Sequence, residues 1–339
     1  MSMNKIFIPA GYKSLLSVYE TQKAIGMIKR LFEDNISAAL NLRRVSAPLF
    51  VEPMTGFNDD LDGVQRPVGF DITKINAKAQ IVQSLAKWKR IALHKYGFPP
   101  GEGIYADMNA IRRDESDLGD NTHSVYVDQW DWEKVIDESM RSESTLKEAV
   151  KNIVSAICIT QEQIKFKFPQ LNPGLSSEVS FITAQELEDM YPKLSYEERE
   201  HAYTKEKKTV FIMKIGGFLK SGGRHGSRSP DYDDWDLNGD ILFWSNLLGR
   251  AVEISSMGIR VDEKSLDAQL TASNCDYRRG LLYHKMLLAG ELPLTIGGGI
   301  GQSRLCMLLM QKAHIGEVQV SVWDEKTISG CADTGIKLL

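Results

Sequence analysis

The sequence predicts an α+β fold in which a mainly antiparallel β-sheet is flanked by helices. Residues 104–112 and 123–132 are strand-like runs that alternate side-chain character and are joined by a polar loop, which indicates an antiparallel hairpin. Three more strand-like runs lie around a loop rich in glycine and aspartate. These strands fall outside a regular alternation of strand and helix, which argues against a parallel sheet.

The N-terminal part of the chain predicts one long helix and several extended segments. Apolar residues recur at helical spacing over residues 12–44, and an extended segment follows at residues 45–53. We expect a strand at residues 78–83. A helix is expected at residues 85–96, because Gly97 and two prolines just beyond it form a stop signal.

Capping boxes mark helix starts in the middle of the chain. In each box a hydroxyl side chain and a glutamate three residues later bind each other's backbone N–H groups. The boxes pair Thr145 with Glu148, Thr183 with Glu186 and Ser195 with Glu198. The strands expected after them are residues 209–214, 240–245, 251–259 and 318–323, and the expected helices are residues 262–273 and 278–289.

A glycine-rich segment near the C-terminus predicts an anion-binding turn. A strand-like run at residues 292–296 precedes the glycines of residues 297–301, and leucines then recur at helical spacing, so Arg304 falls in the first or second turn of a helix. A cation there costs about 0.3–1 kcal/mol unless an anion neutralises it, and phosphate is the usual anion. The third glycine of a dinucleotide fingerprint and the Lys-Ser or Lys-Thr pair of a Walker motif are missing. A glycine-rich turn with a solvated arginine is the alternative.

Polar side chains continue the apolar faces of the predicted hairpin. Arg112 extends the face of the leading strand, while His123, Gln129 and Asp131 share one face of the returning strand. Polar groups at one end of two apolar faces predict the floor of a polar pocket. The alternative is that the strand ends fray and these side chains turn to water.

Three further clusters suit ionic ligands. Ser84 and Lys89 lie in a basic segment that predicts a carboxylate site, or alternatively a solvated helix face. Asp240 and Glu253, on neighbouring strands, are candidate magnesium ligands, or alternatively strand caps or partners of arginines. Residues 224–240 mix arginines and aspartates, which suits a mobile nucleotide-covering loop or a disordered acidic loop.

Composition and spacing exclude several classes of protein. A net charge of −4 and a pI near 5.9 give no global attraction to nucleic acid. No apolar run approaches the ~20 residues that span a bilayer, so no membrane partner is expected. The cysteines are scattered without a C-x-x-C pair, which fits a reducing cytoplasm and no zinc site. Asp234-x-Asp236-x-Asn238-Gly239 starts like a calcium loop, but its twelfth position is Ser245 instead of glutamate.

Taken together, these segments resemble the three motifs of class II aminoacyl-tRNA synthetases: a long helix leading into an extended segment, an arginine-bearing strand with its returning strand, and Gly-x-Gly-x-x-Arg leading into a helix. Five strings more specifically resemble the ammonia-dependent asparagine synthetases, the type A aspartate–ammonia ligases. They are SLAKWKR (84–90), HSVYVDQWDWE (123–133), PDYDDW (230–235), SSMGIR (255–260) and GGGIGQSRL (297–305). We expect one catalytic domain over residues 1–339, with a core at about 14–323 and a C-terminal tail at 324–339.

The resemblance implies a two-step ligase reaction. The side-chain carboxylate of L-aspartate would attack the α-phosphorus of ATP, giving β-aspartyl-AMP and pyrophosphate. Ammonia would then displace AMP to give L-asparagine. The resemblance further implies Mg²⁺ as cofactor, a homodimer formed through the first motif, and a cytoplasmic location.

The resemblance also implies roles for individual residues. The catalytic set would be Asp59, Arg112, Gln129 and Arg304, in which the two arginines hold the α- and γ-phosphates and stabilise charge during adenylation. Arg228 would add a phosphate contact, and Asp240 and Glu253 would hold the metal and nucleotide. The residues expected to bind aspartate are Ser84, Lys89, Gln129, Asp131, Asp233, Ser256 and Arg260. Asp59, or Asp60 beside it, would receive ammonium and take its proton.

Three other functions are weighed against this one. A tRNA ligase of the same fold is disfavoured because no separate anticodon-binding domain is evident and the net charge is negative. A catalytically inactive amino-acid-binding paralogue is disfavoured because both phosphate arginines and both metal carboxylates are present. A glutamine-dependent synthetase needs a cysteine nucleophile near the N-terminus, and the first cysteine is Cys158.

Overall fold

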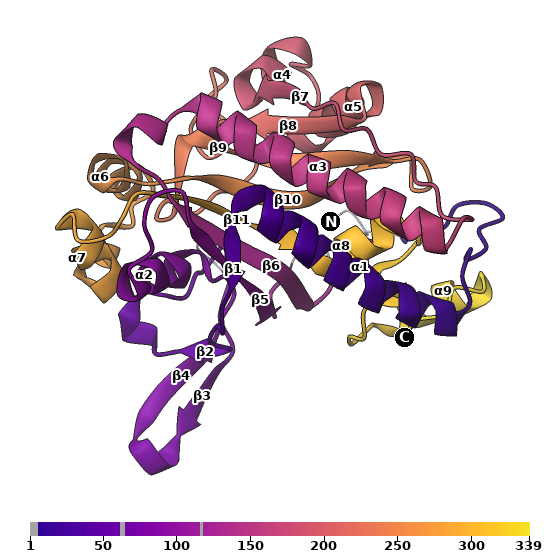
Figure 1. Ribbon diagram of the computed structural model, residues 1–339, viewed down its shortest axis with the longest axis horizontal. Coiled ribbons are helices and arrows are strands. Elements are labelled where there is room, and N and C mark those ends of the chain that lie inside the picture. The colour runs from indigo at the N-terminus through magenta and orange to yellow at the C-terminus, as the bar shows by residue number, and fades with distance from the viewer. Residues whose placement is uncertain (1–5, 62–64, 116–117) are drawn as a thin grey trace.

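The central feature of the computed structural model, which describes residues 6–61, 65–115 and 118–339, is an eight-stranded sheet (Figure 1). In spatial order its strands are β1 (Leu42–Arg44), β5 (Gly103–Ile111), β6 (Tyr126–Val135), β11 (Thr295–Gly301), β10 (Arg250–Arg260), β9 (Asp233–Ser245), β8 (Thr209–Met213) and β7 (Ser180–Thr183). The pairings are antiparallel except at the two edges, where β1 pairs with β5 and β7 with β8 in parallel. The predicted α+β class is confirmed.

Two long helices, α1 (Val18–Leu40) and α3 (Glu143–Lys167), cover one face of this sheet (Figure 1). Their apolar sides bury the main core, in which the rings of Phe32 and Trp130 lie 4.6 Å apart. Helix α1 begins at a capping box formed by Ser17 and Glu20. It ends earlier than predicted, because Asn41 adopts a left-handed backbone and the next residues pair with β5 as β1.

Other helices lie behind the sheet or at its ends. Their bounds are α2 (Ala86–Tyr96), α4 (Ala184–Met190), α5 (Tyr196–Lys207), α6 (Glu263–Ala272), α7 (Leu282–Leu288), α8 (Gln302–Leu309) and α9 (Glu325–Asp333). Short 3-10 turns are η1 (Pro53–Thr55), η2 (Thr73–Ile75), η3 (Glu138–Met140), η4 (Asp276–Gly280) and η5 (Ile315–Glu317). Side chains of α2, α6 and α7 share a second core around Ile91, Leu266 and Tyr283. None of the helices in the described part of the chain combines the length and apolar content that crossing a bilayer requires.

A small three-stranded sheet projects from the body of the molecule (Figure 1). It consists of β2 (Phe50–Val51), β4 (Ala77–Ile81) and β3 (Gly69–Ile72), in that order. The predicted strand at residues 78–83 is therefore present, but outside the main sheet. β3 was not predicted, because its four residues are too few to show a period.

Several predicted boundaries are wrong. Helix α3 begins two residues before the box at Thr145, because the Ser142 side chain accepts from the Thr145 N–H and is itself the cap. The helix predicted at 278–289 is divided into η4 and α7 at Leu281, whose backbone is extended. Residues 318–323 form no strand, and within them Gln319 instead binds the Ser303 side chain.

The chain ends pack together. α9 and the residues after it contribute Cys331 and Ile336 to a cluster that also contacts Ile6, Ile8 and Tyr12. Asn121, in the predicted polar loop at residues 113–122, binds the backbone of Phe7 and the Ala313 carbonyl. Residues 116 and 117 of that loop lie outside the described ranges. The tail is thus joined to the body by packed apolar side chains.

Candidate active site

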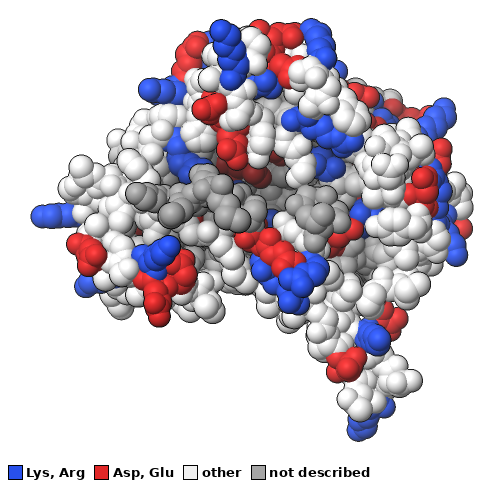
Figure 2. Space-filling view, turned by 180° about the vertical axis from the view of Figure 1, so that it is seen from behind, with Lys and Arg blue, Asp and Glu red and all other residues white. Residues whose placement is uncertain are grey.

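Two connected cavities lie on the face opposite α1 and α3. A wide cleft of about 590 Å³ and a narrow pocket of about 80 Å³ share several lining residues, namely Leu61, Arg112, Gln129, Tyr232, Ser256 and Gly299. Seen from behind, the molecule is hollowed near its middle, with acidic and basic side chains gathered around the hollow (Figure 2). The polar pocket predicted from the hairpin therefore exists.

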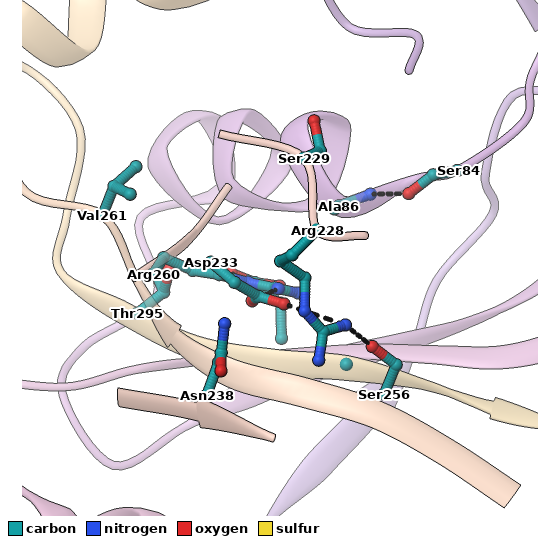
Figure 3. Close-up of polar contacts among 12 residues, drawn as sticks. Ser84, Ala86, Arg228, Ser229, Asp233, Asn238, Ser256, Arg260, Val261 and Thr295 are labelled. Atoms are coloured by element: carbon teal, nitrogen blue, oxygen red, sulfur yellow. Dashed lines mark hydrogen bonds and ion pairs between the residues drawn. The ribbon is translucent and has the colours of Figure 1, made fainter. Parts of the chain in front are cut away.

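The narrow pocket has six of the residues predicted to bind aspartate on its wall. They are Ser84, Gln129, Asp131, Asp233, Ser256 and Arg260. Strand register brings them together, because Asp131 on β6 pairs with Gly299 on β11, which in turn pairs with Ser256 on β10. Ser84 comes from the other side, where its Oγ accepts from the Ala86 N–H at the start of α2 (Figure 3).

Lys89, the seventh predicted aspartate ligand, does not line the pocket. Its ammonium is fully buried beneath the wall, where it pairs with Asp131 and donates to the carbonyls of Trp132 and Gly298. Lys89 Nζ also lies 3.4 Å from the carboxylate of Glu133. Lys89 therefore positions the carboxylates of Asp131 and Glu133 through buried ion pairs instead of facing the cavity.

Arg260 is the centre of a buried charge network at the pocket. Its guanidinium pairs with Asp233 (Figure 3). It also donates to the Glu133 carboxylate, from Nε at 2.9 Å and from Nη2 at 2.7 Å. Although burial opposes ionisation, Arg260 and Lys89 hold the pKa of Glu133 below its ordinary value. Burial opposes the charge on Arg260, but the carboxylates of Glu133 and Asp233 raise its pKa. The pocket therefore presents fixed charges of both signs, which suits a zwitterionic ligand.

The glycine-rich segment has a different structure from the predicted turn. Residues 297–301 belong to β11, and the helix begins only at Gln302. A side chain at Gly297 would overlap the Glu133 carboxylate, and one at Gly299 would overlap the Gln129 amide. The glycines therefore make room for the polar side chains of β6, which then pack directly on the neighbouring strand.

Arginines line the wide cleft from three elements. Arg304 lies in the first turn of α8, as predicted, and its guanidinium is 3.6 Å from the Glu253 carboxylate. Arg112 follows β5, and its Nε is buried without a hydrogen-bond partner among the described residues. Arg228 donates a hydrogen bond to Ser256 (Figure 3). It also forms an ion pair with Asp240 at 2.6 Å. Its Nε likewise has no partner in the described part of the chain. Guanidinium groups on the wall of a cleft suit phosphate oxygens.

Asp240 and Glu253 both line the cleft, on the adjacent strands β9 and β10. Burial raises the pKa of Asp240, and the nearby charge of Glu253 raises it further despite the opposing effect of Arg228. A cation between them would relieve this repulsion. Among the described residues no group of three or more potential metal ligands converges. Two carboxylates fit Mg²⁺, which takes its other ligands from water and phosphates.

The segment at residues 224–240 is only partly a loop. β9 begins at Asp233, so the second half of the segment is a strand and the predicted nucleotide-covering loop is shorter than expected. Its first half contributes Arg224, Arg228 and Ser229 to the cleft wall. The strand conformation of residues 234–239 also agrees with the absence of a helix–loop–helix calcium motif.

Asp59 lies one layer behind the wide cleft. Its side chain is buried, and its Oδ1 lies 3.2 Å from Oγ of Ser229, which does line the cleft. Its Oδ2 is buried without a hydrogen-bond partner among the described residues. Burial raises the pKa of Asp59 to about 6. Asp60 points elsewhere and binds the Arg278 guanidinium at 2.6 Å.

Several residues of the site were missed from the sequence. Glu133 and Tyr232 were not singled out, although both stand in the strings that resembled the family. Glu133 follows Gln129 and Asp131 at a spacing of two on the same strand, and that spacing was the available signal. Lys87, Asp231 and Ser229 gave no such signal, because only the tertiary fold brings them together.

Solved structures of class II aminoacyl-tRNA synthetases resemble this chain in shape. Asparaginyl-tRNA synthetase from Pyrococcus horikoshii, complexed with asparaginyl-adenylate, matches with a TM-score of 0.64 at 15% identity, covering 91% of this chain and 70% of that one. Aspartyl-tRNA synthetase from Entamoeba histolytica matches with a TM-score of 0.60 at 16% identity, covering 90% and 58%. The fold is therefore that of the class II synthetase catalytic domain.

Sequence comparisons give the particular family. The model of the aspartate-ammonia ligase family matches residues 19–335. The aspartate–ammonia ligase of Clostridium perfringens is 58% identical over 99% of this chain and 100% of its own length. That of Ruminiclostridium cellulolyticum is 56% identical with the same coverage. The chain belongs to the aspartate–ammonia ligase family.

Proposed function

We propose that this chain makes L-asparagine from L-aspartate, ammonia and ATP through β-aspartyl-AMP, releasing AMP and pyrophosphate. The observation that carries the proposal is a narrow pocket with fixed charges of both signs that opens into a wide cleft lined by arginines. A carboxylate resists ammonia until its oxygen becomes a good leaving group. The pocket suits an amino acid and the cleft suits a triphosphate, and the two meet at Gln129 and Ser256. This arrangement places the carboxylate of aspartate beside the phosphates of ATP, which can activate it.

Aspartate is held in the narrow pocket by charge complementarity. Asp131 or Asp233 pairs with its ammonium group, and Arg260 faces its α-carboxylate. Both pocket carboxylates are already paired with cations of the protein, Asp131 with Lys89 and Asp233 with Arg260, so their positions are fixed before the ligand enters. Gln129 and Ser256, which line both cavities, lie where the side-chain carboxylate meets the nucleotide.

ATP occupies the wide cleft with its phosphates on the arginines. Arg112 stabilises the charge that develops on the α-phosphate as the aspartate oxygen attacks, and Arg304 holds the γ-phosphate, with Arg228 as a further contact. The oxygen of aspartate forms a bond to the α-phosphorus while the bond to the β-phosphate oxygen breaks and pyrophosphate leaves. Asp240 and Glu253 would hold Mg²⁺, which neutralises phosphate charge when bound.

Ammonia attack on the adenylate completes the reaction. The unpartnered oxygen of Asp59 is a place for an ammonium N–H group, and its raised pKa suits a base that must later release its proton. Nitrogen forms the new bond to the carbonyl carbon as the bond to the phosphate oxygen breaks, and AMP leaves.

The most direct test incubates the protein with MgATP and aspartate and identifies the products. With ammonium we expect asparagine, AMP and pyrophosphate, and with glutamine no turnover. ADP and phosphate would contradict the adenylate route, and equal rates with both nitrogen donors would contradict ammonia dependence. Charging of tRNA with aspartate would instead support a tRNA ligase. Aspartate binding without ATP cleavage would support an inactive paralogue.

The remaining expectations concern the assembly and location. We propose one catalytic domain, a cytoplasmic homodimer and no nucleic-acid partner. The four described cysteines are unpaired, which supports a reducing compartment. Light scattering after gel filtration tests the dimer, and cell fractionation tests the location.

A further inference from the structure

A buried charged cluster behind the cleft has no part in the roles proposed above. Its centre is Asp231, which has no exposed surface. One of its oxygens accepts hydrogen bonds from Lys87 Nζ at 3.0 Å, Arg278 Nη1 at 3.0 Å and His284 Nε2 at 2.8 Å. Although burial opposes ionisation, these partners hold the pKa of Asp231 well below its ordinary value. Asp231 is therefore a fixed negative charge.

Ser229 joins this cluster to Asp59. Its Oγ lies 2.9 Å from Asp231 Oδ1 and 3.2 Å from Asp59 Oδ1. A hydroxyl has one proton to donate and two lone pairs that accept. The shorter contact and the permanent charge of Asp231 direct that proton to Asp231. A lone pair of Ser229 then faces Asp59, which favours Asp59 when it carries a proton and can donate.

We propose that Ser229, oriented by Asp231, is a positioning residue that accepts a hydrogen bond from protonated Asp59 and so holds the proton that Asp59 takes from ammonium. The inference rests on the ammonia half-reaction proposed above. One N–H bond of ammonium breaks and an O–H bond forms on Asp59, while Ser229 and Asp231 keep their own protons and charge. The freed ammonia forms the C–N bond, AMP leaves, and the second proton passes to water.

The other charged groups around Asp59 do not replace this role. Lys87 on α2 and Arg278 on η4 are cations whose pKa values are raised, so both stay charged where Asp59 titrates. They favour the ionised form of Asp59, whereas burial and the charges of Asp231 and Asp60 favour the protonated form. Tyr232, which lines the cleft, has its pKa raised by burial and by Asp59 and stays neutral. His284 reaches Asp59 only through Asp231, and burial lowers its pKa.

The test compares Ser229→Ala with the wild type in two assays. Aspartate-dependent exchange of pyrophosphate into ATP reports adenylation, and asparagine release at saturating ammonium reports the second step. We expect the ratio of asparagine release to exchange to fall roughly 10-fold, because protonated Asp59 loses its acceptor. For the same reason the acid limb of kcat should move to lower pH. A serine that instead donates to Asp59 would shift that limb to higher pH, which would overturn the proposal.

Three controls separate this role from a packing role. Ser229→Thr keeps the hydroxyl and should restore both the ratio and the pH profile. Ser229→Gly also removes the hydroxyl without adding volume. If the alanine variant is unstable, the same ratio and pH profile are measured on the glycine variant. Thr160→Val removes another buried hydroxyl, on α3, and should leave the profile unchanged. An unmoved acid limb in both hydroxyl-free variants contradicts the inference, whereas an inactive wild type contradicts the proposed function.

Discussion

The narrow pocket and the wide cleft are both lined by charged side chains, but they satisfy those charges differently. In the pocket, Arg260 binds two buried carboxylates, and Lys89 beneath it has no exposed surface. In the cleft, Arg304 is about a quarter exposed and faces a half-exposed glutamate. The pocket is preorganised by the fold, whereas the cleft has binding capacity left for its ligand.

Arginine therefore serves two purposes in this molecule. An arginine of the pocket supports the protein as well as the ligand, because its removal leaves buried charges unpaired. Arg304 of the cleft contributes little to folding, since partly exposed ion pairs are worth only about 0–1 kcal/mol. Substitutions should therefore separate stability from catalysis along the boundary between the two cavities.

The largest expected effect is that of Arg260→Met. It leaves Glu133 and Asp233 without their shared cation in a buried site, which should lower the free energy of unfolding by about 3–5 kcal/mol. Urea unfolding monitored by circular dichroism measures it. Folded protein should also show a strongly raised KM for aspartate. A stability equal to the wild type would mean that the pocket is not preorganised.

The matched variant in the cleft is Arg304→Met. Its unfolding free energy should change by no more than about 1 kcal/mol. Adenylation should slow by about 10²–10³-fold, because the triphosphate loses a charge-stabilising contact. Pyrophosphate exchange at varied ATP concentration checks this. An unchanged rate of pyrophosphate exchange would contradict the assignment of Arg304 to the phosphate site.

Asp59→Asn probes the layer behind the cleft. The pKa of Asp59 in the folded protein is about 6, above its ordinary 3.8, so its favourable contribution is complete below about pH 4 and is lost as the pH rises through 6. The stability of the wild type relative to the variant should therefore fall by about 3 kcal/mol across that window. The variant should still exchange pyrophosphate but make little asparagine. Loss of exchange would place Asp59 in adenylation instead.

The smallest of these effects is expected for Gly297→Ala. The added methyl group would overlap the Glu133 carboxylate on the next strand and should cost about 1–3 kcal/mol. Gly217→Ala is the control, because a methyl group there meets nothing within 4 Å and should change stability by less than about 0.5 kcal/mol. Thermal melts of the pair measure the difference. Equal melting temperatures would show that β11 tolerates a side chain at position 297.

The elements with long, clear periods were predictable from the sequence. The hairpin of β5 and β6 and the helix α1 follow directly from apolar spacing. The strand predicted at residues 318–323 is wrong because alternation alone does not ensure a pairing partner. The turn predicted at residues 297–301 is a strand because its glycines accommodate side chains of β6, and that need arises only once the strands are in register.

The candidate site was predictable only in part, because single residues can be matched to the family but contacts between different elements cannot. Residues with roles that the family resemblance implies, such as Arg112 and Asp240, do line the cleft. Lys89 was assigned to the ligand, but in the fold it serves the wall of the pocket. Networks such as Lys89 with Glu133 depend on side chains from different elements meeting in a buried place. No spacing along one strand or helix contains that information.

The packing of the two chain ends against each other has a practical consequence. Asn121 binds Phe7 and also Ala313, which packs with Cys331 and Ile336. The neighbouring Thr122 carbonyl accepts a hydrogen bond from Arg304 of the cleft. Truncation or a bulky fusion at either end should therefore disturb nucleotide affinity before it unfolds the sheet. Because Ile8 and Ile336 belong to one cluster, a short linker could join the described residues near the N-terminus to those near the C-terminus, so the chain is a candidate for circular permutation with new ends in the projecting small sheet.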